Sequence, residues 1–307
     1  MYLQAIVNET ETIPEVTAKS SSKTVRLLKL FLKIIISGLC LWYVSTKINL
    51  NELKQTINSA SLSSLAVVLV IFLVSKIFAV KRFDIYLRAI NIRLTEWENI
   101  KLFWLGMFYN LFLPGSISGD AYKVILLKRT FNSSYKKTMS TVLLDRFSGL
   151  LALGVLLAVY GLFVLENNTY IIILLIAATA VIIITYFITR KFFPYFSGIF
   201  LSTFFWGLLV QLLMVLCIEM IVRALGIETN SAQYVFIFLI AAVAGVLPFT
   251  IGGGLGIREL VFLEGAKYFG LDQHIAVAVS LLFYLITLVA SLPGIIFAYK
   301  NPLQRYK

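Results

Sequence analysis

Residues 234 to 259, YVFIFLIAAVAGVLPFTIGGGLGIRE, decide which kind of fold this chain can adopt. The apolar first half of this stretch is shorter than the roughly 20 residues that a helix needs to cross a bilayer, and it stops before Pro248. Four glycines and the adjacent pair Arg258 and Glu259 follow. Broken backbone at membrane depth is tolerated only where protein or a water-filled cavity surrounds it. The stretch therefore predicts a re-entrant helical element, over about residues 234 to 247, beside a polar cavity.

A second broken stretch lies in the first half of the chain. Residues 97 to 113 are apolar but short for a crossing, and they run into FLPGSISGD at residues 112 to 120. This pattern favours another re-entrant helix. A helix that begins after the break would direct its positive N-terminal end, together with Lys123, toward an anionic group such as a lipid phosphate. The alternative is a cytoplasmic turn in which Asp120 caps a helix.

The remaining apolar stretches are long enough to cross a membrane. The chain has 307 residues, of which 60% are hydrophobic and only 14% charged. Soluble domains contain fewer hydrophobic and more charged residues than this. Full spans are predicted at about residues 27–45, 62–80, 141–165, 171–189, 199–222 and 275–299. We therefore expect an all-α integral membrane protein, with about six transmembrane helices plus two re-entrant helical elements.

The distribution of positive charge predicts the orientation of these spans. Most of the 27 Lys and Arg residues fall in the segments 19–33, 81–101, 123–137, 190–191 and 300–307, all on one side of the predicted spans. Cytoplasmic loops carry such an excess. We expect a multi-pass protein of the inner (cytoplasmic) membrane with both termini in the cytoplasm. Because the basic residues alternate with apolar spans, they do not indicate nucleic-acid binding.

The order of the segments predicts two related halves. Residues 1–22 are polar and are expected to form a disordered cytoplasmic tail, and residues 23–307 form a single transmembrane domain. Its halves, about 25–165 and 166–300, each contain two spans, a broken segment and another span. The first half starts inside and the second outside, which is the pattern of an inverted-topology repeat. Such repeats place their broken segments at a shared central site.

Ionisable groups and glycines near the two breaks are the candidate site residues. An arginine fork suits phosphate, and glycines let the backbone and its N–H groups approach a ligand. The predicted substrate-binding residues are Asp120, Lys123, Asp145, Arg146, Gly252, Gly253, Arg258 and Glu259. The predicted re-entrant breaks contain Pro114, Gly115, Gly119, Pro248, Gly254 and Gly256.

Asp145 and Arg146 lie inside a predicted span, where ionisable groups are expensive and normally paired. Adjacent residues cannot share one helix face. Asp145 is therefore expected to bond another segment, and Arg146 either to lie near the cytoplasmic interface or to pair with Asp120 or Glu219. These pairs are either structural or contacts to a substrate. Glu259 is expected to balance Arg258.

Catalytic and metal chemistry finds little support in the sequence. Cys40 and Cys217 stand alone in apolar segments, and His274 is the only histidine. No GxSxG, Walker A or HExxH signature is present, although each would mark a known catalytic or nucleotide site. We expect no catalytic residue, no metal and no cofactor. Broad apolar helix faces permit a homodimer.

Three motifs carry a resemblance to a known family. They are FLPGSISGDAYKVILLKR at residues 112–129, LLDRFSGL at 143–150 and PFTIGGGLGIREL at 248–260. Through these motifs, taken in this order and spacing, the chain resembles the lysylphosphatidylglycerol synthase transmembrane-region family, also called flippase-like membrane proteins. The resemblance covers about residues 25–300. In that family, members with a C-terminal soluble domain attach lysine to phosphatidylglycerol and flip the product. The resemblance implies the translocating part without the aminoacyl-transfer enzyme.

The residues and the resemblance together predict translocation (flipping) of a phospholipid or lipid-linked substrate between leaflets. The expected partner is a membrane lipid with an anionic headgroup or a polyprenyl phosphate, and the chain is expected to be a lipid transporter and not an enzyme. One alternative is a membrane enzyme or accessory subunit that acts on polyprenyl-phosphate-linked sugars. Another is a small-solute transporter, which needs a cavity closed to lipid.

Overall fold

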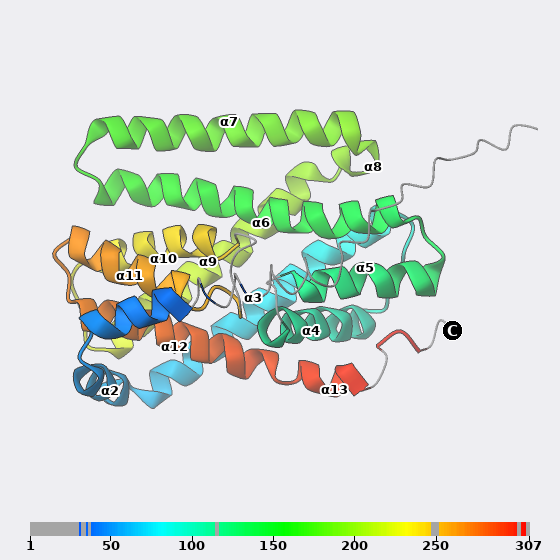
Figure 1. The fold of residues 1–307 in the computed structure, drawn as a ribbon. Coiled ribbons are helices and arrows are strands. Elements are labelled where there is room, and N and C mark those ends of the chain that lie inside the picture. The colour runs from blue at the N-terminus through cyan, green and yellow to red at the C-terminus, as the bar shows by residue number, and fades with distance from the viewer. Residues whose placement is uncertain are drawn as a thin grey trace, which may run out of the picture.

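The computed structural model describes residues 31, 35, 38–113, 117–246, 252–299 and 302–304, and over these ranges the regular structure is helical, without strands. The helices run side by side along a common direction (Figure 1). They are α2 (Leu50–Ser59), α3 (Leu62–Ala89), α4 (Glu96–Phe112), α5 (Ser118–Phe131), α6 (Tyr135–Val164), α7 (Asn168–Phe192), α8 (Pro194–Ser197), α9 (Phe200–Ala224), α10 (Ser231–Gly245), α11 (Ile257–Tyr268), α12 (Gln273–Ser291) and α13 (Gly294–Tyr299).

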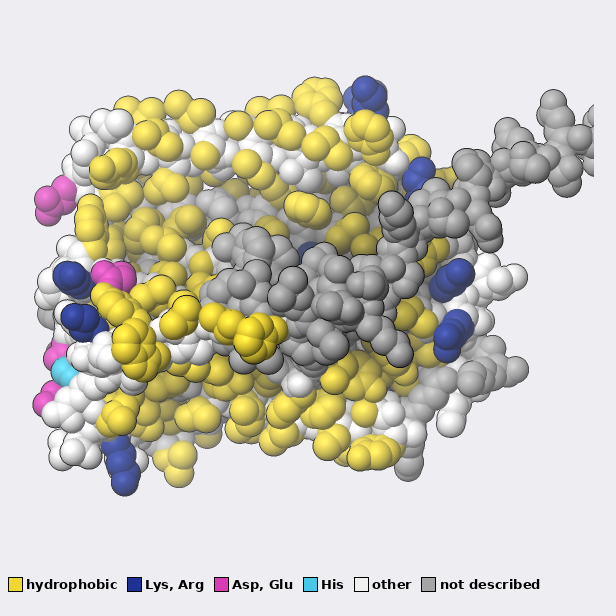
Figure 2. Space-filling view, viewed as in Figure 1, with side chains coloured by type: hydrophobic (Ala, Val, Ile, Leu, Met, Phe, Trp, Pro, Cys, Tyr) yellow, Lys and Arg dark blue, Asp and Glu magenta, His cyan; other side chains and the backbone are white. Residues whose placement is uncertain are grey.

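Five helices of the described chain are long and apolar enough to cross a membrane, namely α3, α6, α7, α9 and α12. They confirm an all-α integral membrane protein. The predicted span at residues 27–45 and the predicted tail at 1–22 fall largely or wholly outside the described residues. Figure 2 shows hydrophobic side chains over the middle of one face, with charged side chains toward its two ends. That arrangement fits a multi-pass membrane protein.

Two helices differ from the predicted spans. The basic stretch after Val80 was expected to be a loop, but α3 continues through it to Ala89. Phe83 and Leu87 on this extension are fully buried, so core packing holds the helix together beyond the apolar span. The span expected to be continuous over 275–299 is instead divided into α12 and α13 around Pro293. Proline removes an intrahelical hydrogen bond and clashes with the preceding turn, which accounts for the break.

Two helical hairpins enter the bundle from opposite ends (Figure 1). The pair α4 and α5 enters from the end that also carries α13, and the pair α10 and α11 from the other. Their tips meet, because a Cβ added to Gly252 would lie 3.6 Å from the carbonyl oxygen of Leu111. The two re-entrant elements and the inverted-topology repeat stay predictions. The break residues Pro114, Gly115 and Pro248 lie outside the described residues.

Glycine permits the close packing of the first hairpin. A Cβ added to Gly119, in the first turn of α5, would lie 2.0 Å from the backbone oxygen of Gly106 in α4. The N–H of Gly119 also donates a 2.8 Å hydrogen bond to Oδ1 of Asn110. The side chain of Asn110 thus satisfies one of the free donors at the start of α5. Only glycine at position 119 allows these two helices to lie this close.

We expect Gly119→Ala to lower the stability of the protein, because its methyl group would overlap the backbone of α4. Overpacking of this kind costs about 1–3 kcal/mol. Gly154→Ala in α6 is the matched control, since nothing lies within 4 Å of a Cβ added there. Thermal unfolding in detergent, followed by size-exclusion fluorescence, measures the difference. Equal melting temperatures for the two variants would contradict the close approach.

Candidate functional site

A cavity of about 350 Å³ is lined by residues of α3, α4, α6, α9, α10, α11 and α12 and by the glycine-rich loop before α11. Much of its wall is apolar. Four cationic side chains from three helices also reach it: Lys76 and Arg82 from α3, Arg146 from α6 and Arg258 from α11. Among the described residues, no carboxylate lines this cavity. Cations that line a hollow within an apolar bundle can pair with an anion.

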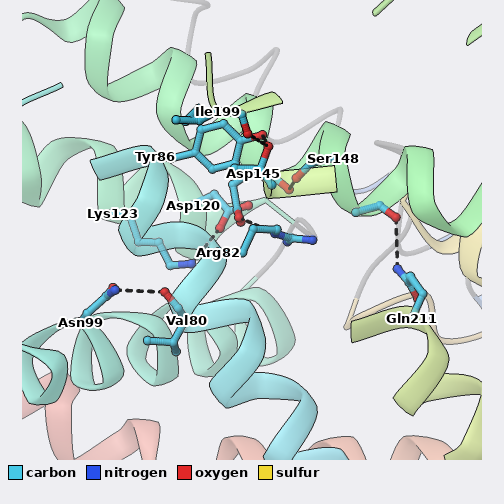
Figure 3. Close-up of polar contacts among 12 residues, drawn as sticks. Val80, Arg82, Tyr86, Asn99, Asp120, Lys123, Asp145, Ser148, Ile199 and Gln211 are labelled. Atoms are coloured by element: carbon cyan, nitrogen blue, oxygen red, sulfur yellow. Dashed lines mark hydrogen bonds and ion pairs between the residues drawn. The ribbon is translucent and has the colours of Figure 1, made fainter. Parts of the chain in front are cut away.

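Arg82 is held by a carboxylate on a neighbouring helix. Its Nε donates to Oδ1 of Asp145 at 2.8 Å, and both residues are buried, at 6% and 7% exposure. Figure 3 shows the guanidinium reaching past Asp145 toward Gln211. A Cβ added to Gly149 would lie only 3.0 Å from Nη1 of Arg82, so glycine makes room for the guanidinium. Nη1 itself is buried and has no hydrogen-bond partner in the described chain.

Asp120 joins two cations on different helices. It accepts a hydrogen bond from Nε of Arg146, and its Oδ1 lies 3.4 Å from Nζ of Lys123. Nζ of Lys123 also lies 5.1 and 4.6 Å from the ring centroids of Phe83 and Phe103. The structure thus pairs Arg146 with Asp120, which is one of the alternatives that the sequence left open. Lys123 faces Asp120 and these rings instead of the cavity.

Arg258 is positioned by a buried network on α11 and α12. Its Nε and Nη2 donate to Oγ and the carbonyl oxygen of Ser280, at 3.1 and 2.7 Å. Ser280 Oγ in turn donates to Oε1 of Glu259 at 2.9 Å, and that carboxylate lies 3.7 Å from Nη2 of Arg258. Glu259 therefore balances Arg258 as expected. The guanidinium carbon of Arg258 also lies 5.3 and 5.6 Å from the ring centroids of Phe283 and Tyr284.

The glycine-rich loop before α11 has a left-handed backbone conformation at four of its glycines. Gly252, Gly253, Gly254 and Gly256 have φ values of 56°, 74°, 98° and 89°, which side chains other than glycine rarely adopt. The N–H of Gly256 donates to Oε2 of Glu259 at 2.6 Å. This N–H is therefore used to cap α11, while the expectation that the amides of Gly252 and Gly253 face a ligand stays a prediction.

The predicted site residues separate into two groups. Arg146, Gly253 and Arg258 line the cavity. The others lie behind its wall as partners of these cations or within the loop: Asp120, Lys123, Asp145, Gly252 and Glu259.

Sequence reasoning missed Lys76, Arg82 and Gln211 as parts of the cavity wall. Arg82 was assigned to a basic loop because it follows an apolar span. The signal that points to it is Asp145, since a carboxylate within a span needs a cation from another segment. Gln211 on α9 donates from Nε2 to the carbonyl oxygen of Gly149 at 3.2 Å.

We expect Asp145→Asn to destabilise the protein strongly, because it leaves the charge of Arg82 buried without a counterion. Breaking a buried pair on one side costs about 3–5 kcal/mol. The double variant Arg82→Gln/Asp145→Asn should recover much of this loss. Asp84→Asn is the control, because its partner Arg88 is 63% exposed. Thermal unfolding in detergent distinguishes the variants, and a melting temperature for Asp145→Asn equal to that of Asp84→Asn would refute the buried pair.

Comparison with known proteins agrees with this architecture. The family model described as the lysylphosphatidylglycerol synthase TM region matches residues 30–294. A UPF0104 membrane protein of Pyrococcus horikoshii is 27% identical over 108 residues, which are 34% of this chain and 32% of that relative. The chain thus matches about a third of the relative's length. Because the family model covers most of the chain, the protein belongs to the family of the lysylphosphatidylglycerol synthase transmembrane region.

Proposed function

We propose that this protein translocates an anionic phospholipid or lipid-linked substrate between the leaflets of the cytoplasmic membrane. The observation that carries the proposal is the cavity in which Lys76, Arg82, Arg146 and Arg258 converge within an apolar bundle. Family membership supports a role in lipid metabolism or transport. Both termini lie in the cytoplasm in this proposal, because the segments predicted on one side of the spans hold most of the Lys and Arg residues.

The cavity suits the charged headgroup better than a whole lipid. Its volume of about 350 Å³ lies at the small end of ligand pockets, which span roughly 300–1,000 Å³. A phosphate that leaves water needs replacement hydrogen bonds and counter-charge, and arginine forks supply both. The headgroup therefore occupies the cavity while the acyl chains remain in the surrounding lipid.

The two hairpins offer access from either side of the membrane. The pair α4 and α5 and the pair α10 and α11 come from opposite ends (Figure 1), and the cavity is lined by Phe103 of the first pair and by Gly245 and Gly253 at the tip of the second. In transporters built this way, movement of one half against the other opens a fixed central site alternately to each side. We infer that the headgroup binds at the hairpin tips and is released to the opposite leaflet.

Dithionite quenching of fluorescent phospholipids in proteoliposomes tests this function. We expect the wild-type protein to expose the inner-leaflet lipid that stays protected in empty vesicles. Arg258→Gln should slow quenching about tenfold, the effect of losing about 1.4 kcal/mol of headgroup binding. Arg190→Gln, an exposed cation at the end of α7, should leave the rate unchanged. Size-exclusion profiles confirm that all three proteins are folded.

The opposite outcome is equally informative. If wild-type protein and empty vesicles behave alike over anionic, zwitterionic and polyprenyl lipids, downhill translocation is contradicted. The alternative of a membrane enzyme or accessory subunit acting on polyprenyl-phosphate-linked sugars would then be favoured.

A further inference from the structure

A second pocket, of about 450 Å³, lies where α5 ends and α6 begins. We call it the α5–α6 pocket, and it is lined by Ile125, Lys128, Arg129, Asn132 and Tyr135. None of these residues lines the central cavity. Figure 1 shows α5 joining α6 at the end of the bundle that carries α13, which is the cytoplasmic end in the proposed topology. Figure 2 shows Lys and Arg side chains at this end.

The cations of the α5–α6 pocket have no acidic partner in the described chain. Lys128 and Arg129 are exposed, and no described carboxylate lies within 4.0 Å of either. Nζ of Lys128 instead lies 5.9 Å from the ring centroid of Tyr135. Residues 121–144 contain no Asp or Glu, so the adjoining sequence supplies no counter-charge. The pocket therefore presents positive charge that an anion from outside the chain can pair with.

Helix stability accounts for only part of this positive charge. Lys128 and Arg129 lie in the last turn of α5, where the helix dipole favours cations. Lys136 and Lys137 lie in the first turn of α6, where the dipole disfavours them. Of these two, Lys137 has its Nζ 4.9 Å from the ring centroid of Tyr195. The turn thus gathers four cations at a local cost to α6, and an anionic partner would offset that cost.

The pocket also has an apolar part. Ile125 and Tyr135 are 45% and 55% exposed, and both line the pocket together with the cations. Tyrosine is enriched at the level of the lipid headgroups, where its ring is in contact with lipid and its hydroxyl with water. Basic pockets between transmembrane helices bind lipid headgroups in other membrane proteins. A soluble anion would pair with the cations only, whereas a phospholipid would also cover the exposed apolar surface.

We propose that the α5–α6 pocket binds the headgroup of an anionic phospholipid from the adjacent leaflet. Lys128 and Arg129 pair with the headgroup, and the start of an acyl chain covers Ile125. This binding place is separate from the central cavity, because no residue lines both. The inference goes beyond the proposed function, since a lipid held at this turn does not have to cross the membrane.

Photo-crosslinking with a matched pair of lipids tests the proposal. Phosphatidylglycerol and phosphatidylcholine probes carry the same diazirine on one acyl chain, close to the glycerol backbone, so they differ only in the headgroup. Each probe is incorporated into proteoliposomes that hold the full-length protein, and mass spectrometry of the digested protein locates the labelled residues. We expect phosphatidylglycerol to label residues 125–135 about tenfold more than phosphatidylcholine, equivalent to about 1.4 kcal/mol.

Two charge-matched variants separate a pocket from a general attraction to positive charge. Lys128→Gln/Arg129→Gln should reduce labelling by phosphatidylglycerol to the level of phosphatidylcholine. Arg190→Gln/Lys191→Gln removes two exposed cations from the last turn of α7, at the same end of the bundle (Figure 1). Neither of these residues lines the pocket, so this variant should retain the preference. An equal loss of labelling in both variants would overturn the proposal. Size-exclusion profiles confirm that the variants are folded.

The outcomes also separate this inference from the proposed function. Equal labelling of residues 125–135 by both lipids would overturn the inference, even if fluorescent lipids are translocated. A clear preference for phosphatidylglycerol without translocation would support the inference and contradict the function. Inorganic phosphate serves as a soluble competitor, with chloride at the same ionic strength as its control. If phosphate abolishes the labelling and chloride does not, the pocket binds a soluble anion and the lipid assignment is overturned.

Discussion

The cost of placing cations inside an apolar helix bundle is the constraint on which the rest of this structure depends. Arg82, Arg146 and Arg258 each contact a carboxylate, and for the first two it comes from a different helix. These pairs hold α3, α5 and α6 together at the level of the cavity and fix the guanidinium groups in place. Apolar side chains alone would not fix the helices in these positions relative to one another. Lipid is as apolar as the helices, so no hydrophobic force drives them together.

Glycine makes this arrangement of charges possible. Gly149 leaves space for the guanidinium of Arg82, and Gly119 lets α5 approach α4 so that Asp120 lies beside Arg146. The left-handed glycines before α11 turn the chain sharply enough to place Arg258 at the cavity while Glu259 caps the helix. The positions of the buried charges therefore depend on these glycines, because close backbone packing places the cations where a ligand could meet them.

The sequence predicted most of the membrane-spanning helices and the interruptions after α4 and α10. The length of an apolar stretch and the presence of Pro and Gly can both be seen within a short segment of sequence. It also offered Asp120 as one possible partner of Arg146, beside Glu219 and a position near the cytoplasmic interface. It did not predict the role of Arg82, since a charge count along the chain cannot distinguish a loop cation from one that a distant carboxylate holds in a helix. The extension of α3 to Ala89 was missed because the packing of its buried side chains against distant segments cannot be seen from the local sequence. The break between α12 and α13 at Pro293 could have been predicted from the sequence, because proline disrupts a helix interior.

The central claim is that the cations of the cavity hold the headgroup of an anionic lipid. Native mass spectrometry tests it most directly, on wild-type protein and Arg258→Gln equilibrated with an equimolar mixture of anionic and zwitterionic lipids of equal chain length. The account predicts that the wild-type protein retains an anionic lipid at collision energies that strip the zwitterionic one, and that Arg258→Gln loses this difference. Equal retention of both lipids by the wild-type protein would contradict it.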